Sequence, residues 1–304
     1  MKLDRRKFLK LGVATGAGAV GLGGGSGNKA GAADAAEAAV AAGEKEEFVG
    51  VLHDTTRCIG CRKCEAGCAR ANGLPVPDID DKTVFHEVRD MRPDAWTVVN
   101  RFETEKGIVH VKKQCNHCNQ AGCAAACLVR AMYKTRPGPV IWRESKCMGC
   151  RYCMISCPFE VPKFEYDKAI PRIQKCTMCF DRQQKGFEPA CVEACPVEAL
   201  TFGTRREIMN IARSRVVADP GSYVNHIYGE REAGGTGWLY LAGVPFDQLG
   251  FRTNVGTTPY PEYTKGFLYT VPVIFVLWPT FMLGLHQLSK RKEAGEEKAT
   301  KDKK

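Results

Sequence analysis

The longest apolar run of the chain lies near its C-terminus, where residues 266–285 read GFLYTVPVIFVLWPTFMLGL without a charged side chain. A helix of this length spans the roughly 30 Å hydrocarbon core of a bilayer. Pro272 and Pro279 would be unusual inside a soluble core helix, whereas membrane helices tolerate proline. The pattern predicts a transmembrane helix over residues 266–286, with a buried helix of a soluble protein as the alternative.

Shorter patterns predict regular elements before this run. Residues 97–99 and 108–111 suit two strands of a hairpin that turns at residues 105–107. Residues 205–215 suit a helix. Residues 216–265 are rich in Gly, Tyr and Pro, so we expect an extended arm with little regular structure that contacts another subunit.

The chain begins with a basic and then mildly apolar segment, Asp4-Arg5-Arg6-Lys7-Phe8-Leu9-Lys10 followed by LGVATGAGAVGLGGG. This segment resembles a twin-arginine export signal with cleavage after Ala32 or Ala35, although Asp4 stands where Ser or Thr is usual. The resemblance implies a signal peptide over residues 1–32 and a linker over 33–47. The alternative is a chance basic start before a flexible Gly/Ala segment.

The formal charge of +10 sits mainly at the two ends of the 304 residues. Residues 1–32 carry six basic side chains against one acidic, residues 290–304 carry seven against four, and the remainder is nearly neutral. A nucleic-acid-binding protein would carry its basic excess on the folded domain, so this class is excluded. By the positive-inside rule, the basic tail over 287–304 is cytoplasmic and the domain before the helix faces the periplasm.

The 16 cysteines are about 5% of the chain, and they fall into four groups of four with none left over. The groups, in chain order, are Cys58, Cys61, Cys64 and Cys68; Cys115, Cys118, Cys123 and Cys127; Cys147, Cys150, Cys153 and Cys157; and Cys176, Cys179, Cys191 and Cys195. Groups one and three are C-x2-C-x2-C-x3-C, and Pro follows the last cysteine in groups three and four. This is the bacterial ferredoxin run, in which three thiolates bind one 4Fe–4S cluster and the fourth binds a second.

Disulfides and structural zinc are two other uses of cysteine pairs. Export and an even count would suit disulfides, but cysteines at three-residue spacing are poor disulfide partners. Structural zinc also uses C-x2-C pairs, but the third cysteine at the same spacing and the trailing Cys-Pro favour iron–sulfur. A group that lacked one cysteine would suggest a 3Fe–4S site, but all four groups are complete. We therefore expect four 4Fe–4S clusters.

Pseudo-twofold pairing predicts which cysteines share a cluster, because the last cysteine of each group binds the cluster of the partner group. Groups one and four form an outer pair, and groups two and three an inner pair inserted between them. The expected ligand sets are Cys58/Cys61/Cys64/Cys195, Cys68/Cys176/Cys179/Cys191, Cys115/Cys118/Cys123/Cys157 and Cys127/Cys147/Cys150/Cys153.

These motifs resemble the four-cluster ferredoxin-like electron-transfer subunits of membrane-bound oxidoreductases. The resemblance is carried by CIGCRKCEAGCARANGLP (58–75), CMGCRYCMISCPFEVPKFEYD (147–167) and KCTMCFDRQQKGFEPACVEACPVEALTFGTRREI (175–208), and it covers roughly residues 1–290. It implies an α+β fold of two pseudo-twofold-related bacterial ferredoxin-like (βαββαβ-type) domains. The outer domain comprises residues 48–107 and 168–215, and residues 108–167 form the domain inserted into it. Group two departs from the pattern, with Ala121-Gly122 and Leu128 where Pro is usual.

The resemblance implies a non-catalytic subunit that passes single electrons from a periplasmic catalytic subunit to a membrane quinone- or haem-bearing subunit, or in reverse. The nearest branches are the HybA-like hydrogenase-2 subunits and the formate dehydrogenase beta subunits. A signal of its own favours a hydrogenase partner, and a formate dehydrogenase or other molybdenum/tungsten enzyme is the alternative. A non-redox zinc or disulfide scaffold is the remote alternative.

Other polar and aromatic residues receive simpler interpretations. No nucleophile–base pair, flavin site or molybdopterin signature is visible, so no catalytic residue is predicted. His117 is interpreted as a loop residue, with cluster ligation as a lesser alternative. His286 is interpreted as an interfacial residue, with a quinone or haem contact as the lesser alternative. Four aromatic residues near group three are expected to pack around the clusters: Trp142, Tyr152, Phe159 and Phe164.

Overall fold

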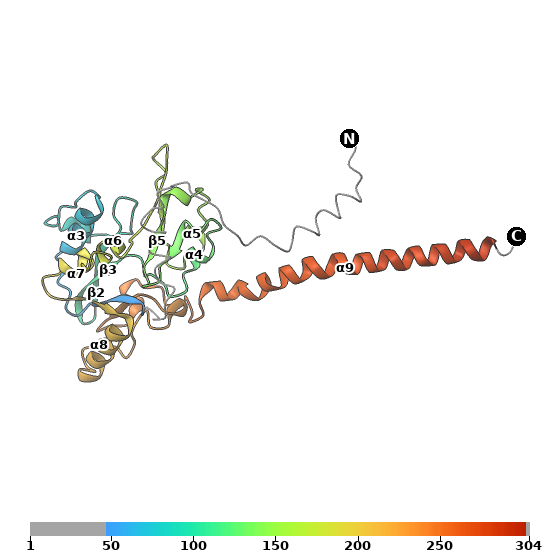
Figure 1. Ribbon diagram of the computed structural model, residues 1–304. Helices are drawn as coiled ribbons and strands as arrows, with labels where there is room; N and C mark the ends of the chain where they lie inside the picture. Colours follow the sequence, from blue (N-terminus) through green and yellow to red (C-terminus); the bar gives the residue numbers. More distant parts are fainter. Residues whose placement is uncertain (1–46, 302–304) are drawn as a thin grey trace, which may run out of the picture. The chain divides into compact units, whose positions relative to one another are not determined.

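The computed structural model describes residues 47–301, with side chains described as far as residue 295 (Figure 1). The expected signal peptide over 1–32 lies outside the described residues, as does all but the last residue of the expected linker. The described part mixes short strands and helices, in agreement with the expected α+β class.

The central sheet has the strand order β8-β1-β9. Strand β1 (Val49–Asp54) runs antiparallel to β8 (Leu200–Thr204) and parallel to β9 (Trp238–Leu241). Its register places Val51 opposite both Phe202 and Trp238. Because β1 is the middle strand, it is buried along nearly its whole length.

The two faces of this sheet bury different partners, because successive side chains of a strand point to opposite faces. On one face, leucines of β1 and β9 pack against helix α8 (Arg205–Ala218). On the other face, Val51, Trp238 and Tyr240 belong to a hydrophobic core that also contains cysteines of three groups. The sheet therefore forms one wall of the cysteine-bearing core.

Helix α8 confirms the helix predicted over residues 205–215 and extends it to Ala218. A capping box starts it: the backbone N–H of Glu207 donates to the Thr204 hydroxyl at 3.3 Å, and the Glu207 carboxylate accepts from the Thr204 backbone N–H at 2.9 Å. Two otherwise unpaired N–H groups at the helix start are satisfied in this way.

The predicted hairpin is also confirmed, and it is longer than predicted. Strands β2 (Val98–Thr104) and β3 (Gly107–Lys113) pair antiparallel from Val98 opposite Lys113 to Thr104 opposite Gly107. The inward side chains Val99 and Val111 join the same core as Trp238.

Two helix pairs carry cysteines, and a glycine allows close approach in each. Helix α3 (Lys63–Asn72) packs against α7 (Ala190–Glu193), where a Cβ on Gly67 would lie 2.9 Å from the Ala190 carbonyl oxygen. Helix α4 (Gly122–Ala125) packs against α5 (Tyr152–Ile155), where a Cβ on Gly122 would lie 2.7 Å from the Ser156 carbonyl oxygen. The Gly122 contact gives a physical reason for glycine at this departure from the family pattern.

The remaining short elements connect these pairs. Two small antiparallel ladders are formed by β4 (Met132–Lys134) with β5 (Val140–Trp142) and by β6 (Lys163–Phe164) with β7 (Ile173–Gln174). A short helix and four 3-10 turns complete the described elements: α6 (Phe180–Gln183), η1 (Thr83–Phe85), η2 (Glu144–Lys146), η3 (Glu232–Gly234) and η4 (Phe246–Leu249).

The expectation of little regular structure over residues 216–265 is wrong in part. Helix α8 continues to Ala218, and Trp238–Leu241 form strand β9 of the central sheet. All four β9 side chains are buried, and Phe246 and Leu249 of η4 are buried beside them. Much of this segment is thus integral to the core and not an arm, because its apolar run pairs with β1 far back along the chain.

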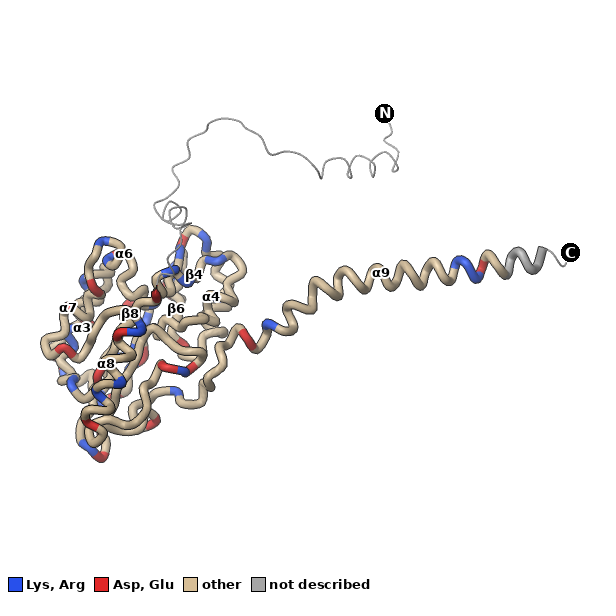
Figure 2. The backbone as a smooth tube through the Cα atoms, turned by 60° about the horizontal axis from the view of Figure 1, so that its bottom comes forward, with Lys and Arg blue, Asp and Glu red and all other residues tan. Residues whose placement is uncertain are grey.

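The apolar run near the C-terminus lies inside helix α9 (Tyr260–Lys301), which is longer than the predicted 266–286. Its segment Tyr260–Gly295 is long and apolar enough to cross a membrane, by length and composition. Figure 2 shows an uncharged stretch that ends at the basic cluster of residues 290–292. Pro272 and Pro279 lie within the helix, as membrane helices allow.

Candidate metal centres

The four cysteine loops share one backbone feature. The residue before the second cysteine has a positive φ in every group: Gly60 (+69°), His117 (+49°), Gly149 (+73°) and Met178 (+55°). This left-handed residue turns the chain between two cysteines three positions apart. Two of the four positions hold glycine, which adopts this conformation without strain, while His117 and Met178 adopt it with nearly fully buried side chains.

The structure places Cys195 of group four with group one. Cys58, Cys61, Cys64 and Cys195, which we call set one, line a single pocket together with His53 and Lys112. Burial first, and then the neighbouring thiols Cys195 and Cys61, raise the pKa of the Cys58 thiol to about 11.

Set two combines the last cysteine of group one with three cysteines of group four: Cys68, Cys176, Cys179 and Cys191. Burial raises the pKa of the Cys68 thiol well above its usual range. The nearby thiols of Cys176, Cys191 and Cys179 raise it further. Packing of α3 on α7 brings Cys68 and Cys191 together.

In the same way, the last cysteine of group three lies near group two, and the last cysteine of group two lies near group three. Set three is Cys115, Cys118, Cys123 and Cys157, and set four is Cys127, Cys147, Cys150 and Cys153. Burial first, and then the Cys157 and Cys115 thiols, raise the pKa of Cys123 well above its usual range. Burial also raises the pKa of Cys153 to about 12, with smaller contributions from Cys147, Cys127 and Cys150.

Backbone and side-chain N–H groups point at several cysteine sulfurs. The backbone N–H of Met132 donates to Cys127 Sγ, and that of Met178 to Cys176 Sγ, both at 3.3 Å. The Asn72 side-chain amide donates to Cys68 Sγ at 3.7 Å. Such bonds stabilise thiolates and adjust the potential of a metal cluster that they ligate.

Buried positive charge accompanies the thiols. Lys112 and Lys175 are only 2% and 3% exposed, and Lys134 is largely covered. Their ammonium groups donate to a side-chain amide or to backbone carbonyls, and no carboxylate among residues 47–295 forms an ion pair with them. Since a buried charge needs a counter-charge, these lysines fit a centre that is itself negative.

Buried nitrogens without a partner also fit a negative centre that accepts hydrogen bonds. Within the described residues, His117 Nε2 and the indole Nε1 of Trp238 and Trp142 have no hydrogen-bond acceptor. In the described residues no three His, Cys, Asp or Glu side chains lie close enough together to hold one metal ion. Thiols, N–H donors and lysines thus suit a 4Fe–4S cluster, whose inorganic sulfurs accept hydrogen bonds and whose charge is negative.

Comparison with known proteins agrees with this chemistry. Residues 107–205 match the family model of a 4Fe-4S dicluster domain. A protein of Nitratidesulfovibrio vulgaris (strain Hildenborough) is 48% identical over 305 residues, which cover 98% of this chain and 80% of the relative.

Two further relatives have informative names. The hydrogenase-2 operon protein HybA of Escherichia coli O157:H7 is 35% identical over 236 residues, which cover 66% of this chain and 72% of the relative. The iron-sulfur subunit of the nitrate-inducible formate dehydrogenase of Escherichia coli K12 is 34% identical over 206 residues, covering 64% and 67%. This chain belongs to the same family of iron–sulfur electron-transfer subunits.

The matched dicluster range of this iron–sulfur subunit contains groups two to four but not group one. Group one joins the site through space, because α3 packs on α7 and Cys195 lies in its pocket. Phe159, Trp142 and Phe164 pack in the cores beside the cysteines as expected. Tyr152 is wrongly predicted to pack, since its side chain is exposed.

Several residues of the site carry no signal in the sequence. His53, Lys112, Lys134 and Trp238 lie near the cysteine sets but outside the quoted motifs, and Lys175 directly precedes Cys176. Lysines in short strands or loops look like ordinary surface residues. His117 lies in the loop between Cys115 and Cys118, as interpreted, but it is buried and not a surface residue. Its Nδ1 accepts a hydrogen bond from Val140, so that nitrogen already has a structural role.

Proposed function

We propose that this iron–sulfur subunit holds four 4Fe–4S clusters and passes single electrons along them between a catalytic oxidoreductase subunit and a membrane subunit. The observation that carries the proposal is the grouping of all 16 cysteines into four sets, each with three thiols from one loop region and one from another. The clusters supply one-electron redox chemistry. The chain supplies thiolate ligands, N–H donors and buried lysines.

The proposal includes two pseudo-twofold-related ferredoxin-like domains with the boundaries expected above. Two features support it. The α3–α7 and α4–α5 pairs each close on a glycine, Gly67 or Gly122. The loops of groups one and three also repeat one conformation, since Gly60 and Arg62 match Gly149 and Arg151 in positive φ.

Contacts between sets support a spatial order of one, two, three, four. Cys64 of set one interacts electrostatically with Cys191 of set two, and Cys176 of set two with Cys115 of set three. Cysteines of sets three and four share a hydrophobic cluster around Met132 and Val140. An electron could therefore pass from one end of the row to the other through neighbouring centres.

We assign set four to the end nearest the membrane subunit. Cys150 is exposed, and the apolar side chains of Leu128, Met148 and Ile155 near set four are exposed as well, which suits a partner contact. The α4 helix of the inner cysteine groups contacts the start of α9, where Tyr260 approaches Gly122. The catalytic subunit would then meet the end at set one.

A hydrogenase is the partner that we favour, because HybA matches over the larger share of both chains and the resemblance of residues 1–32 to an export signal fits that branch. A formate dehydrogenase is the second candidate, supported by relatives of nearly equal identity.

We further propose a membrane topology for the chain. The cluster domain faces the periplasm after twin-arginine export, and α9 is its single anchor. The tail is cytoplasmic, and His286 lies at the membrane boundary.

Metal analysis tests the cluster count. The full chain, purified anaerobically with its complex, should contain about 16 iron and 16 acid-labile sulfide per chain. Cys195→Ser should lose about one cluster, whereas Ser214→Ala, an exposed change in the same domain on α8, which packs on the sheet face away from the cysteines, should lose none. Far fewer than about 16 iron in the unmodified chain would overturn the four-cluster proposal.

Substrate-driven reduction tests the partner. Membranes containing the complex are exposed to hydrogen or to formate, and cluster reduction is followed by electron paramagnetic resonance. Reduction by hydrogen alone supports the hydrogenase, and reduction by formate alone supports the second candidate.

A change in the N-terminal segment tests the export route. Arg5→Lys with Arg6→Lys should leave the protein in the cytoplasm if the export signal is of the twin-arginine type.

A further inference from the structure

Lys112 is a fully buried ammonium group without an anionic partner. Its side chain, on β3, is 2% exposed, and Nζ donates to Gln114 Oε1 at 2.9 Å. Nζ also lies 4.4 Å from the ring centroid of Trp238. Across residues 47–295, no carboxylate forms an ion pair with it.

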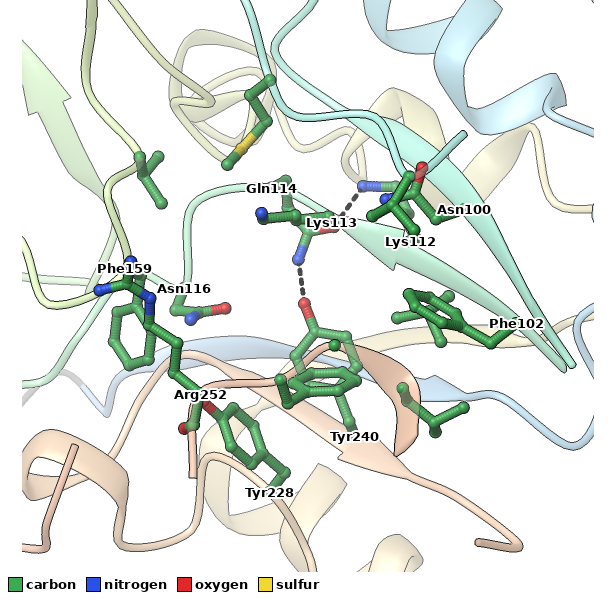
Figure 3. Close-up of a pocket in the computed structure, with 17 residues that line it drawn as sticks. Asn100, Phe102, Lys112, Lys113, Gln114, Asn116, Phe159, Tyr228, Tyr240 and Arg252 are labelled. Atoms are coloured by element: carbon green, nitrogen blue, oxygen red, sulfur yellow. Dashed lines mark hydrogen bonds between the residues drawn. The ribbon is translucent and has the colours of Figure 1, made fainter. Parts of the chain in front are cut away.

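A short relay of polar groups holds this ammonium in place. Figure 3 shows Gln114 between Lys112 and Tyr240, with its amide Nε2 donating to the Tyr240 hydroxyl at 2.5 Å. Tyr240 lies in strand β9, so the position of Lys112 is fixed by the central sheet. Gln114 and Tyr240 thus restrict a long side chain that would otherwise have many rotamers.

Cysteines supply the missing negative charge. Lys112 lines the pocket formed by Cys58, Cys61, Cys64 and Cys195 of set one. Its strongest electrostatic partners are Cys191 of set two and Cys64 of set one, followed by Cys176 and Cys68 of set two. The ammonium group therefore lies where sets one and two meet.

We infer that Lys112 is a shared counter-charge of the two outer clusters and raises the reduction potentials of both. This inference rests on the proposed four-cluster function. Reduction adds one electron to a centre whose thiolates already make it negative, so a fixed positive charge in a poorly solvated site stabilises the reduced form more than the oxidised form. The electron adds to the cluster and no bond forms or breaks.

The charge state of Lys112 is consistent with this role. Burial by itself would lower its pKa, but the surrounding cysteines outweigh that effect and the pKa is raised above its ordinary value. Sets three and four lie beyond this charge. Set three has lysines of its own, since Lys175 and Lys134 interact with Cys123 and Cys118.

Lys112→Met tests the inference, because methionine keeps an unbranched apolar chain and removes the charge. Redox titration of the solubilised complex, followed by electron paramagnetic resonance, gives each midpoint potential. Cys61→Ser and Cys179→Ser identify the signals of sets one and two. We expect the potentials of these two clusters to fall in Lys112→Met while those of sets three and four stay in place. Lys112→Arg keeps the charge, so the potentials of sets one and two should stay near those of the unmodified chain.

Lys113→Met is the matched control, because the neighbouring Lys113 is partly exposed and pairs with Asp90 at 2.9 Å. It should leave all four potentials unchanged. If Lys112→Met loses iron, Lys112→Gln, whose amide can still reach Gln114, carries the same test. Unchanged outer potentials in an uncharged variant with full iron would overturn the inference alone, whereas an unmodified chain with too little iron would overturn the proposed function.

Discussion

The backbone N–H of Val140 donates a hydrogen bond of 2.8 Å to Nδ1 of His117, and this contact determines which ring nitrogen is protonated. Burial, followed by the charges of Lys175 and Lys134, lowers the pKa of His117 well below its ordinary value, so the ring is neutral. With Nδ1 as acceptor, the proton is on Nε2. This N–H is buried and has no acceptor among the described residues.

His117→Asn separates the two functions of this ring. Asparagine can place its carbonyl oxygen near the position of Nδ1 and keep the Val140 bond, but it cannot reach the position of Nε2. A buried unpaired donor costs about 1–3 kcal/mol, so we expect Nε2 to donate to a sulfur of the set-three cluster. His117→Asn should therefore lower the set-three potential, measured by redox titration, with little loss of stability.

His117→Gln is its counterpart, because glutamine reaches the position of Nε2 and loses the Val140 bond. The set-three potential should then stay closer to that of the unmodified chain while the protein unfolds more readily. Equal potentials in His117→Asn and the unmodified chain would show that Nε2 does not donate to the cluster.

Local spacing explains why the cysteines could be grouped from sequence. A C-x2-C-x2-C loop brings its own thiols together wherever it lies, and the predicted exchange of last cysteines agrees with Cys195 lining the pocket of group one. The hairpin β2–β3 and helix α8 were also predictable, because their partners or caps lie within a few residues along the chain.

Long-range pairing explains what the sequence did not reveal. Strand β9 pairs with β1, which precedes it by more than 180 residues, and a four-residue apolar run among glycines does not indicate a strand by its periodicity. Lys112 stands next to Lys113 in β3, yet one is buried among cysteines and the other lies near Asp90. Only the fold around β3 distinguishes the two lysines.

Cys68 and Cys64 lie one helical turn apart on α3, yet we expect them to bind different clusters. Cys68→Ser should remove or alter the paramagnetic signal that Cys179→Ser also affects. Cys195→Ser, although close to Cys191 in sequence, should affect the same signal as Cys61→Ser. If Cys68→Ser affected the Cys61 signal instead, the exchange between groups one and four would be wrong.

Glu65 joins group one to the hairpin through a buried ion-pair network. Its carboxylate accepts from Arg62 at 3.0 Å, from Arg89 at 2.6 Å and from the backbone N–H of Val99 at 2.6 Å. Arg62 is itself buried, so Glu65→Ala leaves an uncompensated charge and should cost about 3–5 kcal/mol of unfolding free energy.

Anaerobic denaturant titration, followed by circular dichroism, measures this change. Glu103→Ala is the control, because the Glu103–Arg101 pair is exposed and such pairs contribute about 0–1 kcal/mol. A loss in Glu65→Ala no greater than that of the control would contradict a structural role for the network.

Gly60 and Gly149 occupy equivalent loop positions with φ of +69° and +73°, but their surroundings differ. A Cβ on Gly60 would lie 2.3 Å from the His110 ring, which packs against Phe85, whereas a Cβ on Gly149 would meet nothing within 4 Å. Gly149→Ala should therefore cost only backbone strain, about 1–2 kcal/mol. Gly60→Ala should cost more and lower the iron content of set one, and equal iron in the two variants would contradict this.

The potential of the set-one cluster should be independent of pH between about 6 and 8. His53 and Lys112 both line its pocket. Burial first, and then the charge of Lys112, lower the pKa of His53 to about 3, so its ring is neutral throughout this pH range. The raised pKa of Lys112 keeps its ammonium charged throughout.

Redox titrations of the solubilised complex at several pH values measure this property. Neither side chain gains or loses a proton in the range, so electron uptake by the set-one cluster should not be coupled to proton uptake there. A midpoint potential that falls by about 59 mV per pH unit would indicate one proton taken up per electron. Such a slope would show that one of these two groups, or another near set one, changes protonation when the cluster is reduced.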